Sequence, residues 1–251
     1  MLRKGQTEAV KRLSNISDIK GKKVLEIGGD LKHETADYLI DQGASHVTSI
    51  NIDPKITTQK INDQLDVVNL DATKLLSYFE EETFDLAFGV AILEHIHNTK
   101  LLLDEVHSVL KPNGTALLHA GPVWTSAIGH HTWVECDQTK YRFNDQSNPI
   151  PDWHHLLFDL EEMVDFLVSK KGMVREHATS VANYIYEDGD LSRMGYMDYI
   201  NAFKDSEFRT IMIYEEAGKP IPEYVGKKLK KTQYENQKEF EVVALQFIVE
   251  K

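Results

Sequence analysis

The sequence predicts an α/β fold in which a mostly parallel sheet lies between layers of helices. Between residues 22 and 119, short apolar runs that suit buried strands alternate with stretches of helical spacing. Strands that alternate with helices in this way are joined by right-handed crossovers, which place them side by side in a parallel sheet. The chain has 251 residues, 41% of them apolar, which is enough for one large core.

Each predicted element rests on a local pattern. The run KKVLEI ends in Gly28 and Gly29, as expected of a buried first strand that is followed by a tight turn. A helix follows over 34–43, where apolar residues recur at helical spacing before a glycine stop. Further strands are predicted at 46–52, 66–70, 84–88, 115–119 and 242–249 and within 172–186, and further helices at 156–171 and 191–204.

Residues 121–155 break the alternation and are rich in Gly, His, Trp, Pro and Asp. An irregular stretch of this length inside a compact domain is usually a functional loop or lid. We therefore expect a helical segment over 1–20 and one domain over 21–251. Substrate-binding insertions are predicted at about 121–155 and 185–240.

Charge and composition narrow the class of protein. The net charge of −12 argues against a nucleic-acid partner, because phosphate backbones are bound by clustered Lys and Arg. No stretch approaches the roughly 18 apolar residues of a membrane span, so no membrane partner is expected. The single cysteine, Cys136, excludes an intramolecular disulfide and predicts a reducing, cytoplasmic setting.

Residues 84–120 carry the strongest functional signal. They read FDLAFGVAILEHIHNTKLLLDEVHSVLKPNGTALLHA: a strand, a polar elbow with Glu94 and His95, a helix, a Pro-Asn-Gly stop and another strand. Open α/β sheets bind ligands at the carboxyl ends of such strands. The Leu-Glu-His-Ile and Leu-Lys-Pro-x-Gly sequences resemble those of class I S-adenosylmethionine (SAM) methyltransferases. This resemblance implies a Rossmann-like, seven-stranded sheet with an antiparallel final strand, and SAM as cofactor.

The resemblance also implies a set of cofactor-binding residues at successive strand ends. Gly28 would allow the tight turn near the methionine end of SAM. Asp53 would accept the ribose hydroxyls and Asp71 the adenine amino group. The complete set is Glu26, Gly28, Gly29, Asp53, Asp71, Ala72 and Gly89.

One residue departs from the family pattern. Asp30 stands where the second glycine of the turn is expected, although Asp tolerates left-handed geometry better than most residues. This departure keeps open the alternative of a SAM-binding partner subunit without catalysis. A nicotinamide dinucleotide protein would need G-x-G-x-x-G, which the sequence G-G-D-L-K-H does not match.

Methyl transfer requires alignment of the acceptor and, for an alcohol, removal of its proton. His95 is the predicted catalytic base, and Glu94 is expected to orient it or to bind substrate. The alternative is that this Glu-His pair is a structural turn element.

Two histidine pairs lie in the irregular region, 130–131 and 154–155. The patterns GPxWxxxxGHH and PxWxHLL resemble a subset of bacterial methyltransferases from glycan or natural-product pathways. Imidazoles from separate segments can hold a transition metal, so His130, His131 and His155 are predicted to bind Fe, Mn or Zn. His131 is also a catalytic candidate. The alternative is a substrate pocket or packed lid without metal. The predicted substrate-binding residues are Trp124, Trp133, His154 and Arg193.

These patterns together predict a SAM-dependent O-methyltransferase that acts on a polar small molecule. The favoured acceptor is a sugar or nucleotide-linked sugar in capsule-type glycan biosynthesis. N-methylation of an amino sugar or small amine is the nearest alternative, and the negative net charge would favour a cationic amine. A homodimer is compatible with this reading.

Overall fold

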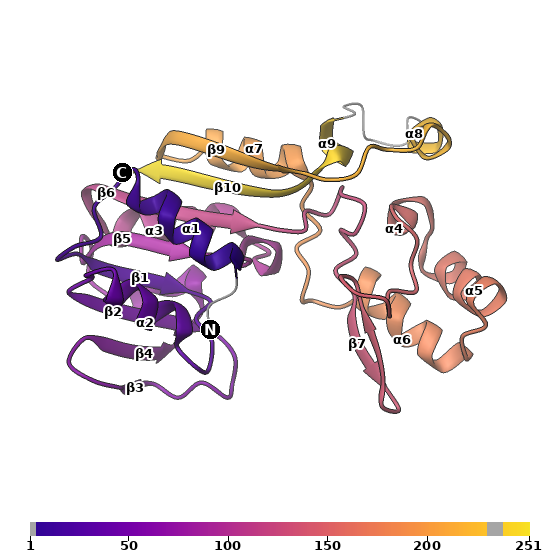
Figure 1. Cartoon of the computed structure of the whole chain (residues 1–251), viewed down its shortest axis with the longest axis horizontal. Coiled ribbons are helices and arrows are strands. Elements are labelled where there is room, and N and C mark those ends of the chain that lie inside the picture. Colours follow the sequence, from indigo (N-terminus) through magenta and orange to yellow (C-terminus); the bar gives the residue numbers. More distant parts are fainter. Residues whose placement is uncertain (1–3, 230–237) are drawn as a thin grey trace. The chain divides into compact units, whose positions relative to one another are not determined.

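The computed structural model describes residues 4–229 and 238–251, which fold into two compact units. Of the described residues, the first unit contains 4–120, 200–214 and 246–251, and the second contains 121–199, 215–229 and 238–245. Figure 1 shows the elements in chain order. Residues 1–3 of the predicted helical segment and 230–237 of the predicted 185–240 insertion lie outside the described residues.

The central sheet has eight strands in the described residues, in the order β3-β4-β2-β1-β5-β6-β10-β9. The strands are β1 (Lys23–Ile27), β2 (His46–Asn51), β3 (Gln59–Lys60), β4 (Leu65–Asn69), β5 (Phe84–Gly89), β6 (Leu110–Ala120), β9 (Arg209–Ala217) and β10 (Val242–Glu250). Neighbouring strands from β4 to β6 pair in parallel, whereas β3 pairs antiparallel with β4 and β10 runs opposite to β6 (Figure 1). The predicted mostly parallel sheet with an antiparallel final strand is confirmed.

Two edge strands were not predicted. β3 has only two residues, too few to give a pattern. β9 has the sequence RTIMIYEEA and lies largely exposed, so its apolar residues do not alternate with polar ones as in a half-buried strand.

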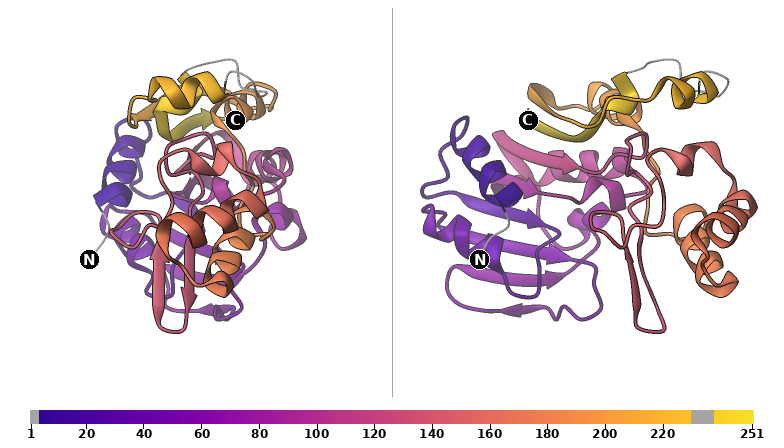
Figure 2. Two further views of the ribbon diagram at one scale, coloured as in Figure 1. Left: turned by 90° about the vertical axis from the view of Figure 1, so that its right-hand side faces the viewer. Right: turned by 45° about the vertical axis from the view of Figure 1, so that its right-hand side comes forward.

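Helices cover both faces of the sheet in the first unit (Figures 1 and 2). On one face, α1 (Lys4–Ser14) and α2 (Glu34–Asp41) bury their apolar stripes, with Leu13 and Leu39 completely inaccessible. On the other face, α3 (Thr99–Val109) buries Leu102, Leu103, Val106 and Val109, a spacing that keeps them on one side of a helix. The Asn98 side chain caps α3 by accepting the Leu101 N–H.

The second unit combines a hairpin with short helices. The hairpin is formed by β7 (Trp133–Cys136) and β8 (Thr139–Arg142). The helices are α4 (His154–Leu157), α5 (Leu160–Lys171), α6 (Arg175–Tyr186), α8 (Glu223–Leu229) and α9 (Lys238–Glu241), while α7 (Tyr196–Lys204) continues into the first unit. A capping box between Asp159 and Glu162 begins α5, and Gly172 ends it in the left-handed conformation.

The strand predicted within 172–186 is wrong, because these residues form α6. Its buried residues Ala178, Val181, Ala182 and Ile185 recur at helical spacing and pack against α5. The helix predicted over 156–171 is interrupted at Phe158, where α4 ends and the cap of α5 begins.

Within the described residues, every helix is too short or too polar to cross a membrane.

Candidate functional site

The turn after β1 leaves no room for side chains. Gly28 has φ +82°, and a Cβ on it would lie 2.4 Å from the Ile92 Cγ2. A Cβ on Gly29 would lie 1.8 Å from the Ser49 Oγ and 2.8 Å from the Glu26 Oε2. The chain therefore needs glycine at both positions, as the sequence predicts.

Glu26 lies buried beneath this turn, with 4% of its surface exposed. Burial raises the pKa of its carboxyl group to about 7, against the opposing effect of hydrogen bonds from Ser49 and Thr35. Its Oε2 has no hydrogen-bond partner among the described residues. A buried acceptor of this kind is suited to an ammonium donor, and the amino group of SAM would provide one. The turn therefore fits the methionine end of the predicted cofactor.

The departure at Asp30 has a local structural explanation. Its Oδ1 accepts the backbone N–H of Lys32 at 2.7 Å, so the carboxylate holds the loop that leads to α2. The Lys32 backbone, rather than its ammonium group, is the partner in this contact.

At the end of β2 the structure adds a residue that was missed in the sequence. The Asn51 Nδ2 donates to the Gly29 carbonyl at 2.8 Å, and its Oδ1 accepts the Asp53 N–H at 2.9 Å. Asn51 thus joins the ends of β1 and β2, with Asp53 two residues beyond. The Asp53 Oδ1 accepts the Lys55 N–H, which fixes the carboxylate on its own turn. An Asn at the last position of the predicted strand is the signal in the sequence, two residues before the predicted Asp53.

At the end of β4, Asp71 caps the short helix η1 (Ala72–Ser77). One oxygen, Oδ1, accepts both the backbone N–H and the hydroxyl of Thr73. The other oxygen lies 3.9 Å from the Lys74 Nζ. Ala72 is buried beside it. The cap holds Asp71 at the strand end where the adenine contact is predicted.

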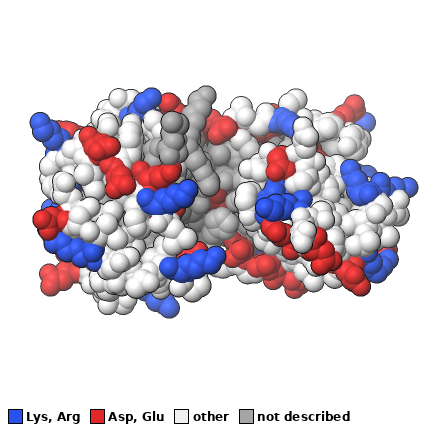
Figure 3. All heavy atoms as spheres, turned by 60° about the horizontal axis from the view of Figure 1, so that its bottom comes forward, with Lys and Arg blue, Asp and Glu red and all other residues white. Residues whose placement is uncertain are grey.

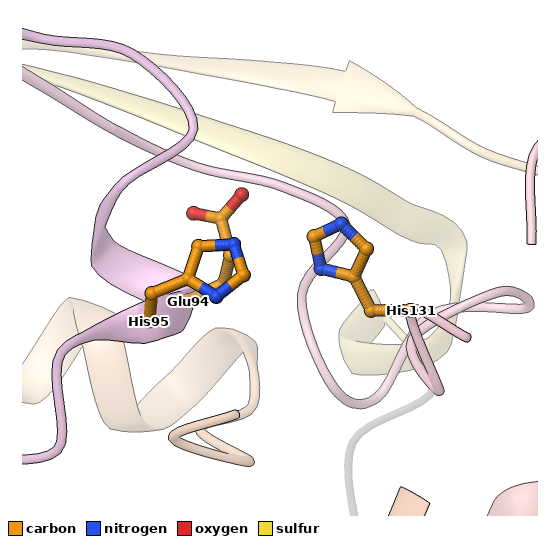
Figure 4. A group of neighbouring side chains, drawn as sticks. All are labelled: Glu94, His95 and His131. Carbon is orange, nitrogen blue, oxygen red and sulfur yellow. The ribbon is translucent and has the colours of Figure 1, made fainter. Parts of the chain in front are cut away.

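The fourth strand end carries the polar elbow. A Cβ on Gly89 would lie 2.9 Å from the Ile92 Cγ1, so Ile92 covers this glycine as well as Gly28. The next turn, η2 (Leu93–His95), carries a buried Glu94 and an exposed His95 (Figure 4). Because β4, β2, β1 and β5 are adjacent and parallel, all four carboxyl ends lie along one edge of the sheet.

In the second unit, His130 and His155 belong to the core. The His130 Nδ1 lies 2.7 Å from the Thr132 Oγ1, and the His155 Nε2 donates to the Trp124 carbonyl at 2.8 Å. Burial lowers the pKa of both imidazoles, that of His155 to about 4, so both are neutral at pH 7.

The predicted metal ligands are not brought together. Within residues 4–229 and 238–251, the donor atoms of His130, His131 and His155 do not form a group within 4.8 Å of one another. His131 has φ +46° and packs edge-on against Phe143 (the His131 ring is drawn in Figure 4). The geometry of the described residues does not support this set of three ligands, because His130 and His155 each use a ring nitrogen for a hydrogen bond within their own unit.

The predicted substrate residues have separate surroundings. Trp124 packs edge-on against His155, and the His154 Nδ1 lies 3.1 Å from the Asp152 carbonyl. The Arg193 guanidinium donates to three backbone carbonyls, those of Ile185, Asp188 and Leu191. Binding of substrate by Arg193 would have to compete with these bonds.

Trp133 is 53% exposed and lines an open cavity of about 710 Å³ within the second unit. The other lining residues are Val134, Ser180, Asn183, Tyr184, Glu187, Asp188 and Asp190. Burial and the nearby Asp190 and Asp188 raise the pKa of Tyr184 to about 12. The Arg142 guanidinium lies 4.2 Å from the centre of the Trp133 ring. The cavity is therefore negatively charged and bordered by an aromatic ring that already carries a cation on one face.

Residues 25–118 match the family model described as a methyltransferase domain. The chain carries a class I methyltransferase domain. The matched segment runs from β1 to β6 and contains every predicted SAM-binding residue.

A curated protein is similar to part of this chain. The chain is 28% identical over 120 residues to phosphoethanolamine N-methyltransferase 2 of Caenorhabditis elegans. The match covers 45% of this chain and 27% of that protein, so the chain spans about a quarter of its relative's length.

Solved methyltransferases share the fold at low sequence identity. A SAM-dependent methyltransferase from Mesorhizobium loti has a TM-score of 0.54 and 15% identity, with 97% of this chain and 96% of that chain covered. Phosphoethanolamine N-methyltransferase 2 of Haemonchus contortus, in complex with phosphomonomethylethanolamine and S-adenosylhomocysteine, has a TM-score of 0.51 and 14% identity, with coverage of 98% and 53%. A Burkholderia thailandensis 1,6-didemethyltoxoflavin-N1-methyltransferase gives a TM-score of 0.51 at 11% identity, with coverage of 99% and 78%. These similarities concern the fold.

Proposed function

We propose that this chain transfers a methyl group from SAM to a polar small molecule. The observation that carries the proposal is the single edge of the sheet at which the glycine turn, Asp53, Asp71 and Gly89 follow one another at adjacent strand ends. The unpartnered Glu26 oxygen within that edge adds an acceptor for the amino group of the cofactor. Bound SAM would supply an electrophilic methyl group, and the protein would align the acceptor with it.

Calorimetric titration with SAM tests this proposal. Wild-type protein should bind SAM, and Asp53→Ala should weaken binding by about tenfold through the loss of a charge-assisted hydrogen bond. Asp63→Ala is a matched control, because Asp63 is exposed on the same unit and pairs only with Lys60 in the described contacts. Absence of SAM binding by the wild-type protein would overturn the proposal.

The acceptor has two candidates of different chemistry. The sequence favours a hydroxyl of a sugar or nucleotide-linked sugar. The acidic and aromatic cavity beside Trp133 and Tyr184 favours a cationic amine, since cations bind to aromatic faces and carboxylates. The curated relative is named for N-methylation of an amine, which supports the same choice. We therefore place the amine first and the hydroxyl second.

Pairs of acceptors that differ only in having an amino or a hydroxyl group distinguish N-methylation from O-methylation. Two such pairs are glucosamine with glucose and ethanolamine with ethylene glycol. Each compound is incubated with the protein and deuteromethyl-labelled SAM, and the masses of the products are measured by mass spectrometry. Trp133→Ala should raise KM for an amine about fivefold while leaving the Kd for SAM unchanged. Tyr224→Ala, another exposed aromatic of the second unit, should leave both unchanged. Methylation of only the hydroxyl members would reverse our order.

We further propose that His95 removes the acceptor proton, with Glu94 and His131 as additional catalytic residues. His95→Asn should lower kcat by about a hundredfold with the Kd for SAM unchanged. If kcat and stability of His95→Asn stay at wild-type values, the role of this residue is neither catalytic nor structural.

Metal assistance and assembly state need separate tests. One equivalent of Fe, Mn or Zn in protein purified without chelator, lost in His131→Ala, would support metal-assisted transfer. A metal-free active enzyme would exclude it. Light scattering tests whether the chain forms a homodimer, and the cytoplasmic setting stays a prediction.

A further inference from the structure

The turn between Gly89 and η2 is held by a single residue of β6, His119. The Ala91 N–H donates to the His119 Nδ1 at 2.9 Å, and the Ile92 N–H donates to the His119 carbonyl at 3.3 Å. The side chain and the main chain of one residue thus bind two successive amides of the turn.

Ala91 requires such support because its backbone is strained. It has φ +55°, in the left-handed region that costs a residue with a Cβ about 1–2 kcal/mol. A strained conformation persists only where surrounding contacts determine it. Ala91 is exposed, so its own side chain supplies little packing, and the bond to His119 is the contact that holds it.

The His119 imidazole is neutral, which allows its Nδ1 to accept the Ala91 N–H. Burial and the nearby Arg12 guanidinium lower the pKa of His119 to about 4, so the ring is neutral at pH 7. Because Nδ1 accepts from an amide, the ring proton is on Nε2. Arg12 is itself held by a 2.6 Å bond to the Gln246 Oε1 and lies over the Tyr214 ring.

The position of the turn determines the position of its neighbours. Ile92, one residue beyond Ala91, covers both Gly28 and Gly89, and its methyl groups occupy the space that a Cβ on either glycine would need. Glu94 and His95 follow directly on η2. A shift of Ala91 would therefore move the wall of the glycine turn and the two polar residues together.

We propose that His119 is a positioning residue, which holds the Ala91–Ile92 turn so that the cofactor pocket and η2 keep their shape. This inference rests on the proposed SAM-dependent function. It assigns no contact between His119 and the substrate.

The test compares two substitutions of His119. In His119→Asn the amide Oδ1 can occupy the place of Nδ1 and keep the acceptor, whereas His119→Leu removes it at similar volume. His119→Leu should bind SAM about tenfold more weakly, equivalent to about 1.4 kcal/mol, and His119→Asn within about threefold of wild type. Ala91→Gly combined with His119→Leu should recover part of the loss, because glycine adopts positive φ without strain. His107→Leu, a histidine on α3 outside this turn, serves as control.

Amide hydrogen exchange provides a readout that does not depend on catalysis. The Ala91 amide should be protected in wild type and His119→Asn, because it donates a hydrogen bond to residue 119. Because Ala91 is exposed, the same amide should exchange rapidly in His119→Leu, where that acceptor is missing. If the wild type fails to bind SAM but the Ala91 amide shows this exchange pattern, the proposed function is wrong while the positioning of the Ala91–Ile92 turn by His119 is supported. Equal SAM binding in His119→Leu and wild type, or equal losses in His119→Leu and His119→Asn, would overturn the positioning role.

Discussion

The Cα of Gly29 lies so close to the Ser49 side chain that a Cβ added to it would be 1.8 Å from the Ser49 Oγ. Ser49 belongs to β2 and also donates a hydrogen bond to the buried Glu26 carboxyl group. The turn after β1 is therefore packed against the neighbouring strand through a polar group, which cannot simply be displaced.

Gly29→Ala should disrupt this packing. The added methyl group would push Ser49 away from Glu26 or move the turn, at a cost of about 1–3 kcal/mol in the free energy of unfolding. SAM binding measured by calorimetry should be lost or weakened more than tenfold. Gly226→Ala is the control, because a Cβ there meets no atom within 4 Å, and it should leave stability unchanged or slightly raised. Wild-type SAM affinity in Gly29→Ala would contradict this account.

Glu26 should make the first unit less stable as the pH rises. Its folded pKa of about 7 exceeds the ordinary value of 4.5, so the folded state holds the proton more tightly than the unfolded state. The contribution is fully present below pH 4.5 and is lost between pH 4.5 and about 7, which amounts to roughly 3 kcal/mol.

Glu26→Gln removes this titration and gives the test. Hydrogen exchange of β1 amides should show wild type losing stability relative to Glu26→Gln between pH 5 and pH 8. Tryptophan fluorescence is unsuitable here, because all three Trp residues belong to the second unit. A constant difference between the two proteins across this range would show that Glu26 does not titrate as described.

His155 should give the opposite pH dependence in the second unit. Its folded pKa of about 4 lies below the ordinary 6.5, so the unfolded state takes up the proton first. Its contribution is present above pH 6.5 and is lost as the pH falls toward 4, again by roughly 3 kcal/mol. Urea unfolding followed by Trp fluorescence at pH 7.5 and 4.5 should show a smaller pH effect in His155→Gln than in wild type. His154→Gln, the half-buried neighbour, should retain the wild-type pH effect.

Arg193→Lys separates a structural role from substrate binding. Lysine cannot reproduce the three carbonyl contacts of the guanidinium, so unfolding should require about 1–3 kcal/mol less free energy. Arg175→Lys, at an exposed ion pair in the same unit, should change stability little. Unchanged stability with a raised KM for the acceptor would instead support the substrate role predicted from the sequence.

Much of the first unit could be predicted because its signals are local. The apolar strands β1, β2, β4 and β5 lie within one or two residues of the predicted ranges, and the glycines lie where the backbone needs them. Asn51 was missed because its function depends on reaching the Gly29 carbonyl on the neighbouring strand, a contact that spacing along the chain does not reveal. His119 was missed for the same reason, since its partner Ala91 lies across the β5–β6 pair.

The second unit was harder to predict because burial decides the chemistry of its side chains. His130 and His155 look like metal ligands in the sequence, yet both are buried and hydrogen-bonded within their own unit. The α6 segment contains Val, Ile and Tyr, which favour strands, but packing against α5 selects a helix.

The distribution of charge on the surface could not be predicted from the net charge. On the face shown in Figure 3, acidic and basic side chains are interspersed.

The return of β10 to the central sheet has a consequence for synthesis on the ribosome. Leu245, Phe247, Ile248 and Val249 of β10 are completely buried, and the Lys251 backbone forms hydrogen bonds with Asn113 and Gly114 of β6. Because synthesis proceeds from the N-terminus, β6 emerges before residues 121–241. Its edge therefore stays unpaired until β10 has been synthesised. Unpaired edges invite pairing with other chains. The nascent first unit should therefore be most prone to aggregation in this interval, and a chaperone that shields β6 should raise the yield of folded protein.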